Sequence, residues 1–161
     1  MRFEPLLMDF VADNGWNDTV ETFEEEGLCR LAVGLRIGGR SFRLLLEGYE
    51  RQQWLVLSLY APFTASPETV ADLSLLFNFL NGTFSYPGHL SVDDDGVVDY
   101  RQIADFGGID AGVAIVHNML HAAADMFERN GAAMEMVASG NAGYADARRA
   151  VERESASREE P

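Results

Sequence analysis

The sequence predicts an α+β domain in which helices pack on an antiparallel sheet, in the order helix, three strands, helix, two strands, helix. Two pairs of apolar runs flank short turns, at Gly38-Gly39 and at Asp95-Gly96, so each pair is predicted to form an antiparallel hairpin. Three other segments repeat apolar residues at the spacing of a helix. Tight hairpins favour this class over a doubly wound parallel fold.

Residues 4–14 are predicted to form the first helix. Pro5 suits the first position of a helix, and Asn14-Gly15 supplies a stop. The acidic segment 17–27 that follows is a strand or a loop. The apolar face of the helix carries Leu6, Leu7, Phe10 and Val11.

The turn at Gly38-Gly39 fixes a strand register. It sets Leu35 opposite Phe42, and a slip of one residue would scatter the apolar side chains over both faces of the sheet. A third strand, WLVLSLYAPF at 54–63, follows a polar loop. The other predicted pairs are Val33 with Leu44, Leu31 with Leu46, Arg30 with Glu47, Leu57 with Leu46 and Leu59 with Leu44.

The opposite face of these strands is too apolar to be left fully in water. We expect the first helix, a second subunit or a protein partner to cover it. Arg and large aromatic residues are enriched at interface centres, although a solvated sheet surface with ion pairs such as Arg30–Glu47 is an equal alternative. The candidate partner or dimer surface consists of Arg43, Leu45, Tyr49, Trp54, Val56 and Tyr60.

The second helix is predicted to begin with Ser66 as N-cap and Pro67 at the first position, and to end at Asn81-Gly82. In the second hairpin, a loop with Gly96 in the left-handed conformation pairs Val92 with Val98 and Leu90 with Tyr100. We prefer this register to a two-residue turn, which would set Val92 beside Asp99. The buried stripe of the helix is Val70, Leu73, Leu76, Phe77 and Leu80.

A long helix is predicted from about residue 110 to 129, where Asn130-Gly131 ends or bends it. We assign residues 1–140 to a single domain. Residues 141–161 are rich in Arg, Glu, Ala and Ser, so we expect a charged tail that is a frayed helix or disordered.

The charge of the chain excludes several classes of partner. Acidic residues number 26 against 12 basic residues, all of them Arg, for a net charge of −14. Such a surface repels nucleic-acid phosphates and anionic membranes, so we expect neither as a partner. The single cysteine, Cys29, allows no internal disulfide, and Asp9 interrupts the N-terminal apolar run. We therefore expect a cytoplasmic protein without a signal peptide.

Few residues suggest catalysis or metal binding. His117 and His121 share a helix face and form half of a metal site, to which His89 or Asp125 would have to add a ligand. Two ordinary helix histidines are the simpler interpretation. The acidic turn at 93–96 resembles a calcium loop, but Gln102 stands where such a loop needs a bidentate carboxylate. We predict no catalytic set, no metal and no cofactor.

Residues 54–108 resemble the YbjN family, a group labelled bacterial sensory transduction regulators. The segments that carry the resemblance are WLVLSLYAPF, LSLLFNFLNGTF and LSVDDDGVVDYRQIADFGG. The resemblance implies a fold like that of type III secretion chaperones, whose members are small, acidic, usually homodimeric, and bind extended segments of client proteins. It brings no catalytic motif.

These observations lead to one expected function and one alternative. We expect a non-enzymatic protein-binding domain, chaperone-like or regulatory, that acts as a homodimer on a protein partner. The alternative is a metal-dependent protein or enzyme that uses His117 and His121.

Overall fold

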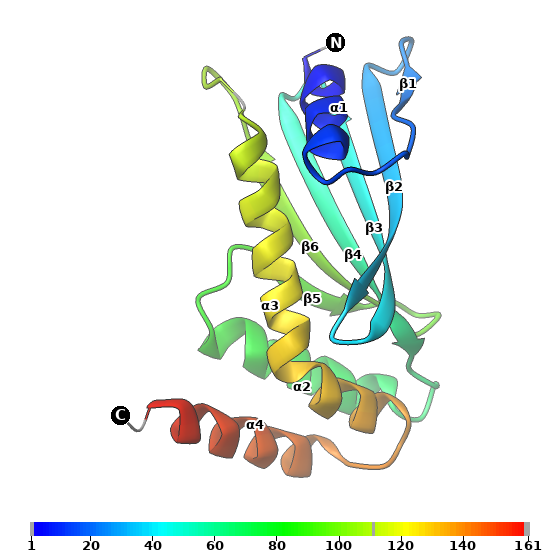
Figure 1. Cartoon of the computed structure of the whole chain (residues 1–161). Helices are drawn as coiled ribbons and strands as arrows, with labels where there is room; N and C mark the ends of the chain where they lie inside the picture. Colours follow the sequence, from blue (N-terminus) through cyan, green and yellow to red (C-terminus); the bar gives the residue numbers. More distant parts are fainter. Residues whose placement is uncertain (1, 111, 160–161) are drawn as a thin grey trace.

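One six-stranded antiparallel sheet, in the order β1-β2-β3-β4-β6-β5, organises the chain (Figure 1). This computed structural model describes residues 2–110 and 112–159. The predicted α+β class with an antiparallel sheet is confirmed. The strands are β1 (Glu21–Phe23), β2 (Leu28–Ile37), β3 (Arg40–Tyr49), β4 (Trp54–Thr64), β5 (His89–Val92) and β6 (Val97–Asp105). The helices are α1 (Phe3–Asp13), α2 (Val70–Thr83), α3 (Val113–Ala138) and α4 (Tyr144–Glu159).

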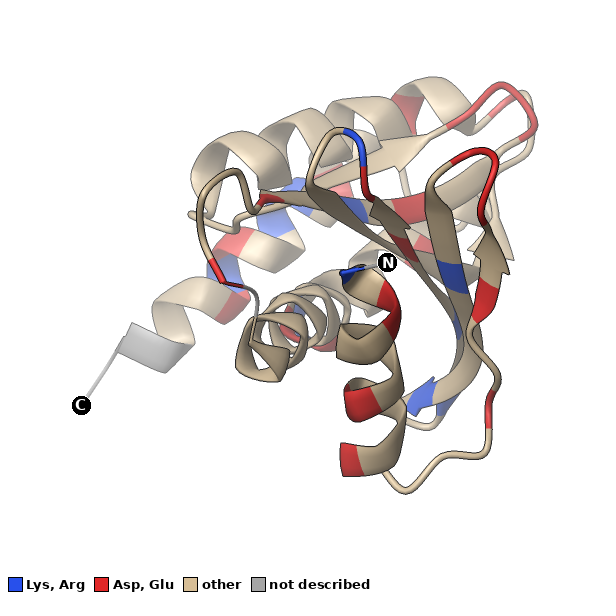
Figure 2. Cartoon of the chain, turned by 90° about the horizontal axis from the view of Figure 1, so that it is seen from above, with Lys and Arg blue, Asp and Glu red and all other residues tan. Residues whose placement is uncertain are grey.

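Helices α1 and α3 lie on one side of the sheet, which we call the inner face. Seen from above, the sheet curves around these two helices (Figure 2). Their apolar stripes and the inner-face side chains form one buried cluster, to which α2 adds its own apolar stripe below the sheet. Representative members are Phe10, Leu44, Leu57, Leu76 and Met126. The sheet is therefore covered on one face by its own chain.

The predicted strand registers are confirmed. Leu35 pairs with Phe42 and Arg30 with Glu47, as the Gly38-Gly39 turn required. Both glycines have positive φ, of 55° and 80°, which is the conformation that this tight turn needs. The same agreement holds for Leu57 with Leu46, Leu59 with Leu44, Val92 with Val98 and Leu90 with Tyr100.

Two helix boundaries differ from the prediction. Regular helix α2 begins at Val70 rather than after Ser66, because residues 67–69 form a turn, and the backbone amides of Thr69 and Val70 both donate to the Ser66 carbonyl. Helix α3 continues through Asn130-Gly131 to Ala138. Asn130 is buried, and its side-chain Nδ2 donates to the Met126 carbonyl. Packing therefore overrides the stop signal.

Most of the described segment after residue 140 is helical, as α4. Helix α4 packs against α2 and α3, and its Ala147 and Val151 side chains are buried. These two residues stand one turn apart, which gives a narrow apolar stripe on an otherwise charged helix. Among the described residues, no helix is both long enough and apolar enough to cross a bilayer.

Candidate functional site

The face of the sheet opposite α1 and α3, here called the outer face, is built by alternation along the strands. The register aligns its side chains in rows across the sheet. One row runs from Phe23 through Leu28, Tyr49 and Trp54 to Asp105. The following rows are Glu21, Arg30, Glu47, Val56 and Ile103; Ala32, Leu45, Ser58, Arg101 and His89; and Gly34, Arg43, Tyr60, Asp99 and Ser91.

The structure brings the six residues of the candidate surface together on this outer face. They are Arg43, Leu45, Tyr49, Trp54, Val56 and Tyr60, and none of them belongs to the buried cluster or packs against it. The suggestion that the first helix covers them is wrong, because α1 packs on the inner face through Phe3, Leu6 and Leu7. Trp54 keeps 42 % of its surface exposed.

Ile103 is an outer-face residue that the sequence interpretation missed. It lies on β6 opposite Val56 and is 52 % exposed. Its strand joins the sheet beside β4, although the whole of α2 separates the two strands in sequence. The alternation of apolar and polar residues in VVDYRQIAD indicates a strand. Nothing in the sequence shows that this strand pairs with β4.

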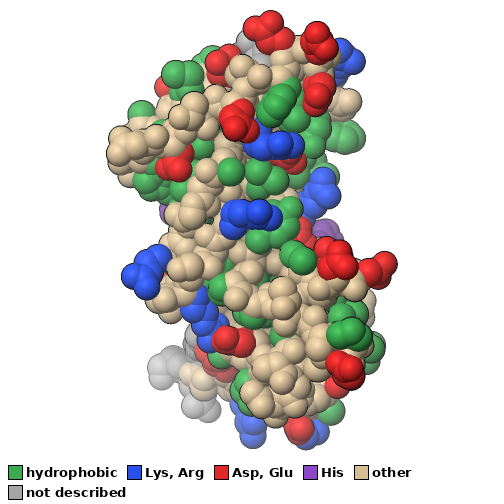
Figure 3. Space-filling view, turned by 90° about the vertical axis from the view of Figure 1, so that its right-hand side faces the viewer, with side chains coloured by type: hydrophobic (Ala, Val, Ile, Leu, Met, Phe, Trp, Pro, Cys, Tyr) green, Lys and Arg blue, Asp and Glu red, His purple; other side chains and the backbone are tan. Residues whose placement is uncertain are grey.

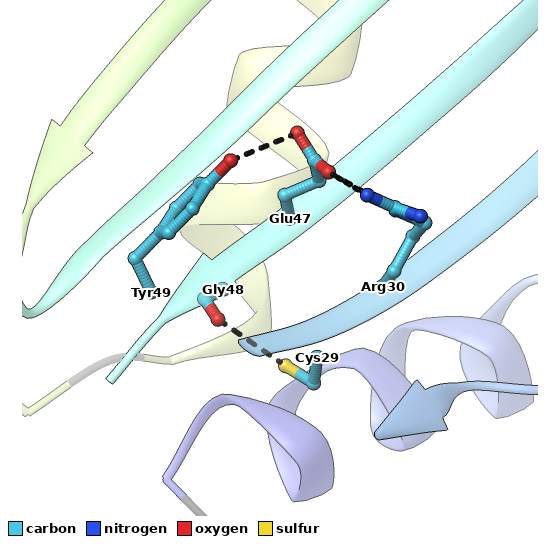
Figure 4. A network of polar contacts seen from close by, with 5 residues as sticks. All are labelled: Cys29, Arg30, Glu47, Gly48 and Tyr49. Atoms are coloured by element: carbon cyan, nitrogen blue, oxygen red, sulfur yellow. Dashed lines mark hydrogen bonds and ion pairs between the residues drawn. The ribbon is translucent and has the colours of Figure 1, made fainter. Parts of the chain in front are cut away.

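A polar network lies beside the apolar residues of this face (Figure 4). Arg30 donates to Glu47 Oε1 from Nε at 3.0 Å and from Nη2 at 2.8 Å. The Tyr49 hydroxyl donates to the other oxygen, Oε2, at 3.2 Å. Burial, and next the charge of Glu47, raise the pKa of Tyr49, so this phenol stays protonated and remains a donor. The central charges of the outer face are thus already paired.

Two other arginines of this face, Arg36 on β2 and Arg43 on β3, have no such carboxylate among the described residues. Arg43 stacks over the Tyr60 ring at 4.6 Å, and within residues 2–110 and 112–159 no ion pair forms at Arg36 or Arg43. Figure 3 views the molecule from the side of β1 and β2, and it shows Arg and hydrophobic side chains interspersed there.

Strand β2 has an open edge next to the outer face. β1 pairs only with Leu28, Cys29 and Arg30, whereas β2 continues to Ile37. The two-residue turn makes Ile37 and Arg40 a hydrogen-bonded pair, so alternate residues back along β2 bond to β3. The N–H and C=O groups of Ala32, Gly34 and Arg36 therefore point away from β3, toward the open edge. Unpaired groups of this kind are a template for an added strand.

At the other side of the sheet, helix α2 packs along β5. Asn81 on α2 pairs with Leu90 on β5 through two hydrogen bonds, one to each backbone polar group. The backbone of Leu90 is therefore already paired, in contrast to the open part of β2.

The two candidate metal ligands lie apart from this surface. His117 faces α1, with Nε2 3.5 Å from Asp13 Oδ2, and its ring centroid is 6.4 Å from that of His121. Asp125, a suggested third ligand, instead accepts hydrogen bonds from Tyr86 and Arg129. No group of three or more His, Cys, Asp or Glu that could hold a metal ion occurs among the described residues.

Two other sequence candidates have structural roles. Cys29 is buried on the inner face, and burial raises the pKa of its thiol to about 11, which disfavours the nucleophilic thiolate. In the acidic turn, Asp93 Oδ1 accepts hydrogen bonds from the amides of Asp95 and Val97. Its carboxylate thus holds the turn of the second hairpin.

Comparison with solved structures supports the fold. A chain in the structure of the HopA1–SchA chaperone–effector complex superposes with a TM-score of 0.50 at 17 % identity, covering 78 % of this chain and 90 % of that chain. A chain in the structure of the ExsC–ExsE complex gives a TM-score of 0.48 at 14 % identity over the same shares. No protein-family model and no curated protein matches the sequence. The predicted type III secretion chaperone-like fold is confirmed; at this identity the likeness concerns the fold alone.

Proposed function

We propose that this chain is a non-enzymatic, chaperone-like protein-binding domain that acts as a cytoplasmic homodimer on a protein partner. The observation that carries the proposal is the outer face, which is partly apolar, paired in its central charges and uncovered by the chain's own helices. Surfaces with exposed Trp, Tyr and Arg are typical of protein interfaces. We also propose that the chain is related to the YbjN family, on the resemblance of residues 54–108.

The open edge of β2 supports a way of holding the partner. An extended segment that pairs with Ala32, Gly34 and Arg36 gains main-chain hydrogen bonds without demanding a particular sequence. The outward-pointing side chains of the segment would extend the outer-face rows that contain Ala32 and Gly34. This mode suits a domain that recognises an extended segment rather than a folded surface.

Photo-crosslinking in cell lysate tests this proposal, because the chain has no Lys for amine-reactive reagents. One variant carries a photo-reactive amino acid in place of Ala32, at the open edge. The control carries it in place of Met8, which is exposed on α1. We expect crosslinks to one or a few proteins from position 32 and none of these from position 8. The proposal would be contradicted if the chain remained uncrosslinked at position 32. It would also be contradicted if both positions gave the same products.

The metal-dependent alternative is not favoured by any contact of His117 or His121. His117 contacts Phe10 and Asp13, which ties α3 to α1. Metal analysis of protein purified without a His tag tests this alternative, and a stoichiometric metal would restore it.

A further inference from the structure

The outer face carries a projecting aromatic side chain and, a few rows away, a hollow. Trp54 stands at the β3–β4–β6 end of the face. A hollow of about 460 Å³ opens where β5 meets β6, lined by Pro87, His89, Ser91, Arg101 and Ile103. The register places the four strand residues of this lining on the outer face. A projection and a hollow on one face are what a two-fold interface needs, because each copy then supplies both.

The charges of the outer face balance, in contrast to the rest of the chain. Four arginines and four carboxylates lie on it: Arg30, Arg36, Arg43 and Arg101 with Glu21, Glu47, Asp99 and Asp105. The whole chain carries −14, so its other surfaces hold the entire excess of negative charge. Two copies repel least where they meet through a neutral face.

Burying this face would leave the Glu47 network satisfied, because Glu47 already accepts hydrogen bonds from Arg30 and Tyr49. The cost of removing paired groups from water is far below that of leaving a charge unpaired. The exposed apolar side chains Trp54 and Ile103 would gain by losing contact with water, whereas their neighbour Val56 is already buried.

We infer that a second copy of this chain covers the outer face, with Trp54 of each copy seated in the other copy's hollow beside Ile103. The inference rests on the homodimer of the proposed function and assigns its interface. The open edge of β2 suits a second copy less well. Antiparallel pairing of two β2 edges about Gly34 would place Arg36 of each copy opposite Ala32 and diagonal to Arg30 of the other copy, so like charges would approach each other.

Sedimentation of the full chain at micromolar concentration tests the interface. Ile103→Glu is the test variant and Leu75→Glu the matched control, because both wild-type side chains are 52 % exposed and Leu75 lies on α2. We expect the wild type and Leu75→Glu to be dimers. Ile103→Glu and Trp54→Arg should weaken dimerisation at least tenfold while keeping the wild-type circular dichroism spectrum.

Disulfide trapping gives a second readout that does not depend on destabilising the interface. In a Cys29→Ala background, a Trp54→Cys chain is mixed with a His89→Cys chain and oxidised. We expect a mixed disulfide dimer from this pair and none when Met8→Cys replaces Trp54→Cys.

The outcomes separate the inference from the proposed function. A dimer that resists Ile103→Glu, or that Leu75→Glu dissociates, overturns the assigned interface and leaves the homodimer standing. A wild-type chain that stays monomeric at 100-fold higher concentration overturns both the interface and the homodimer. Partner capture at the edge of β2 is measured separately, by photo-crosslinking from position 32.

Discussion

The Asn81 side chain pairs with the backbone of Leu90 as a neighbouring strand would. Its Nδ2 donates to the Leu90 carbonyl at 3.0 Å, and its Oδ1 accepts from the Leu90 N–H at 2.9 Å. A side chain on α2 thus pairs with the backbone of Leu90 at the outer side of β5. This relationship gives a physical reason for an Asn at the end of the LSLLFNFLNGTF helix, because it covers backbone groups that could otherwise pair with an added strand.

Asn81→Leu should destabilise the fold by about 1–3 kcal/mol, because both backbone groups of the buried Leu90 lose their partner. Urea denaturation measures the change. Asn78→Leu, at an exposed position on the same helix, should change stability by less than about 0.5 kcal/mol. Equal losses in the two variants would show that the pairing contributes nothing specific.

Gly48→Ala should be strongly destabilising because α1 lies directly on this glycine. An added Cβ would stand 2.4 Å from Phe3 Cβ and 2.8 Å from Cys29 Sγ. We expect a loss of about 1–3 kcal/mol, as for overpacked cores, measured by thermal unfolding. The control is Gly34→Ala on the neighbouring strand, where an added Cβ meets nothing within 4 Å. An unchanged melting temperature for Gly48→Ala would refute the close packing of α1.

Cys29 should resist alkylation in the folded protein. Burial raises the pKa of its thiol from 9.0 to about 11, which lowers the thiolate fraction near neutral pH about 100-fold even before access is considered. The same raised pKa favours the native state below pH 9 and ceases to do so as the pH rises toward 11. Iodoacetamide labelling followed by mass spectrometry measures the reactivity of Cys29 in the folded protein. Full labelling without denaturant would contradict the expected resistance.

The Tyr86 phenol should lose its proton at a higher pH than an ordinary tyrosine. Burial, and next its hydrogen bond to Asp125, raise the pKa of this phenol to about 12. The unfolded chain releases the proton near pH 10, so this contribution to stability is complete below pH 10 and is lost between about pH 10 and 12. Tyr86→Phe should therefore reduce the alkaline loss of stability. An ultraviolet titration in which all tyrosines ionise together would be inconsistent with this.

Amide hydrogen exchange should reveal the open edge of β2 directly. The amides of Ala32, Gly34 and Arg36 face away from β3 and should exchange quickly, whereas those of Leu31 and Val33 bond to β3 and should exchange slowly. Residue-resolved NMR measures the alternation in the free chain. Equal protection of both sets would mean that the edge is already paired.

The hairpins were predictable because their determinants are local. Gly38-Gly39 dictates the turn, and the alternation of apolar residues then leaves one register that buries them. The six-residue candidate surface followed from that register, since each of its residues lies on β3 or β4.

Features that depend on distant packing were not predictable. Helix α3 runs past Asn130-Gly131 because Met134 and Val137 are buried beyond it. Helix α4 packs through two buried side chains, Ala147 and Val151, and so narrow an apolar stripe did not stand out in a charged sequence. Ile103 joins the candidate surface through the pairing of β6 with β4, which no spacing in the sequence reveals.

Affinity capture from a lysate of the native cell tests most directly the proposal that this is a protein-binding domain. Tagged wild type, Trp54→Arg and the control Leu75→Arg are compared, and co-purifying proteins are identified by mass spectrometry. We predict one or two specific partners that wild type and Leu75→Arg retain and Trp54→Arg loses. Absence of any specific partner, or partners indifferent to Trp54, would contradict the account and return attention to the His117 and His121 alternative.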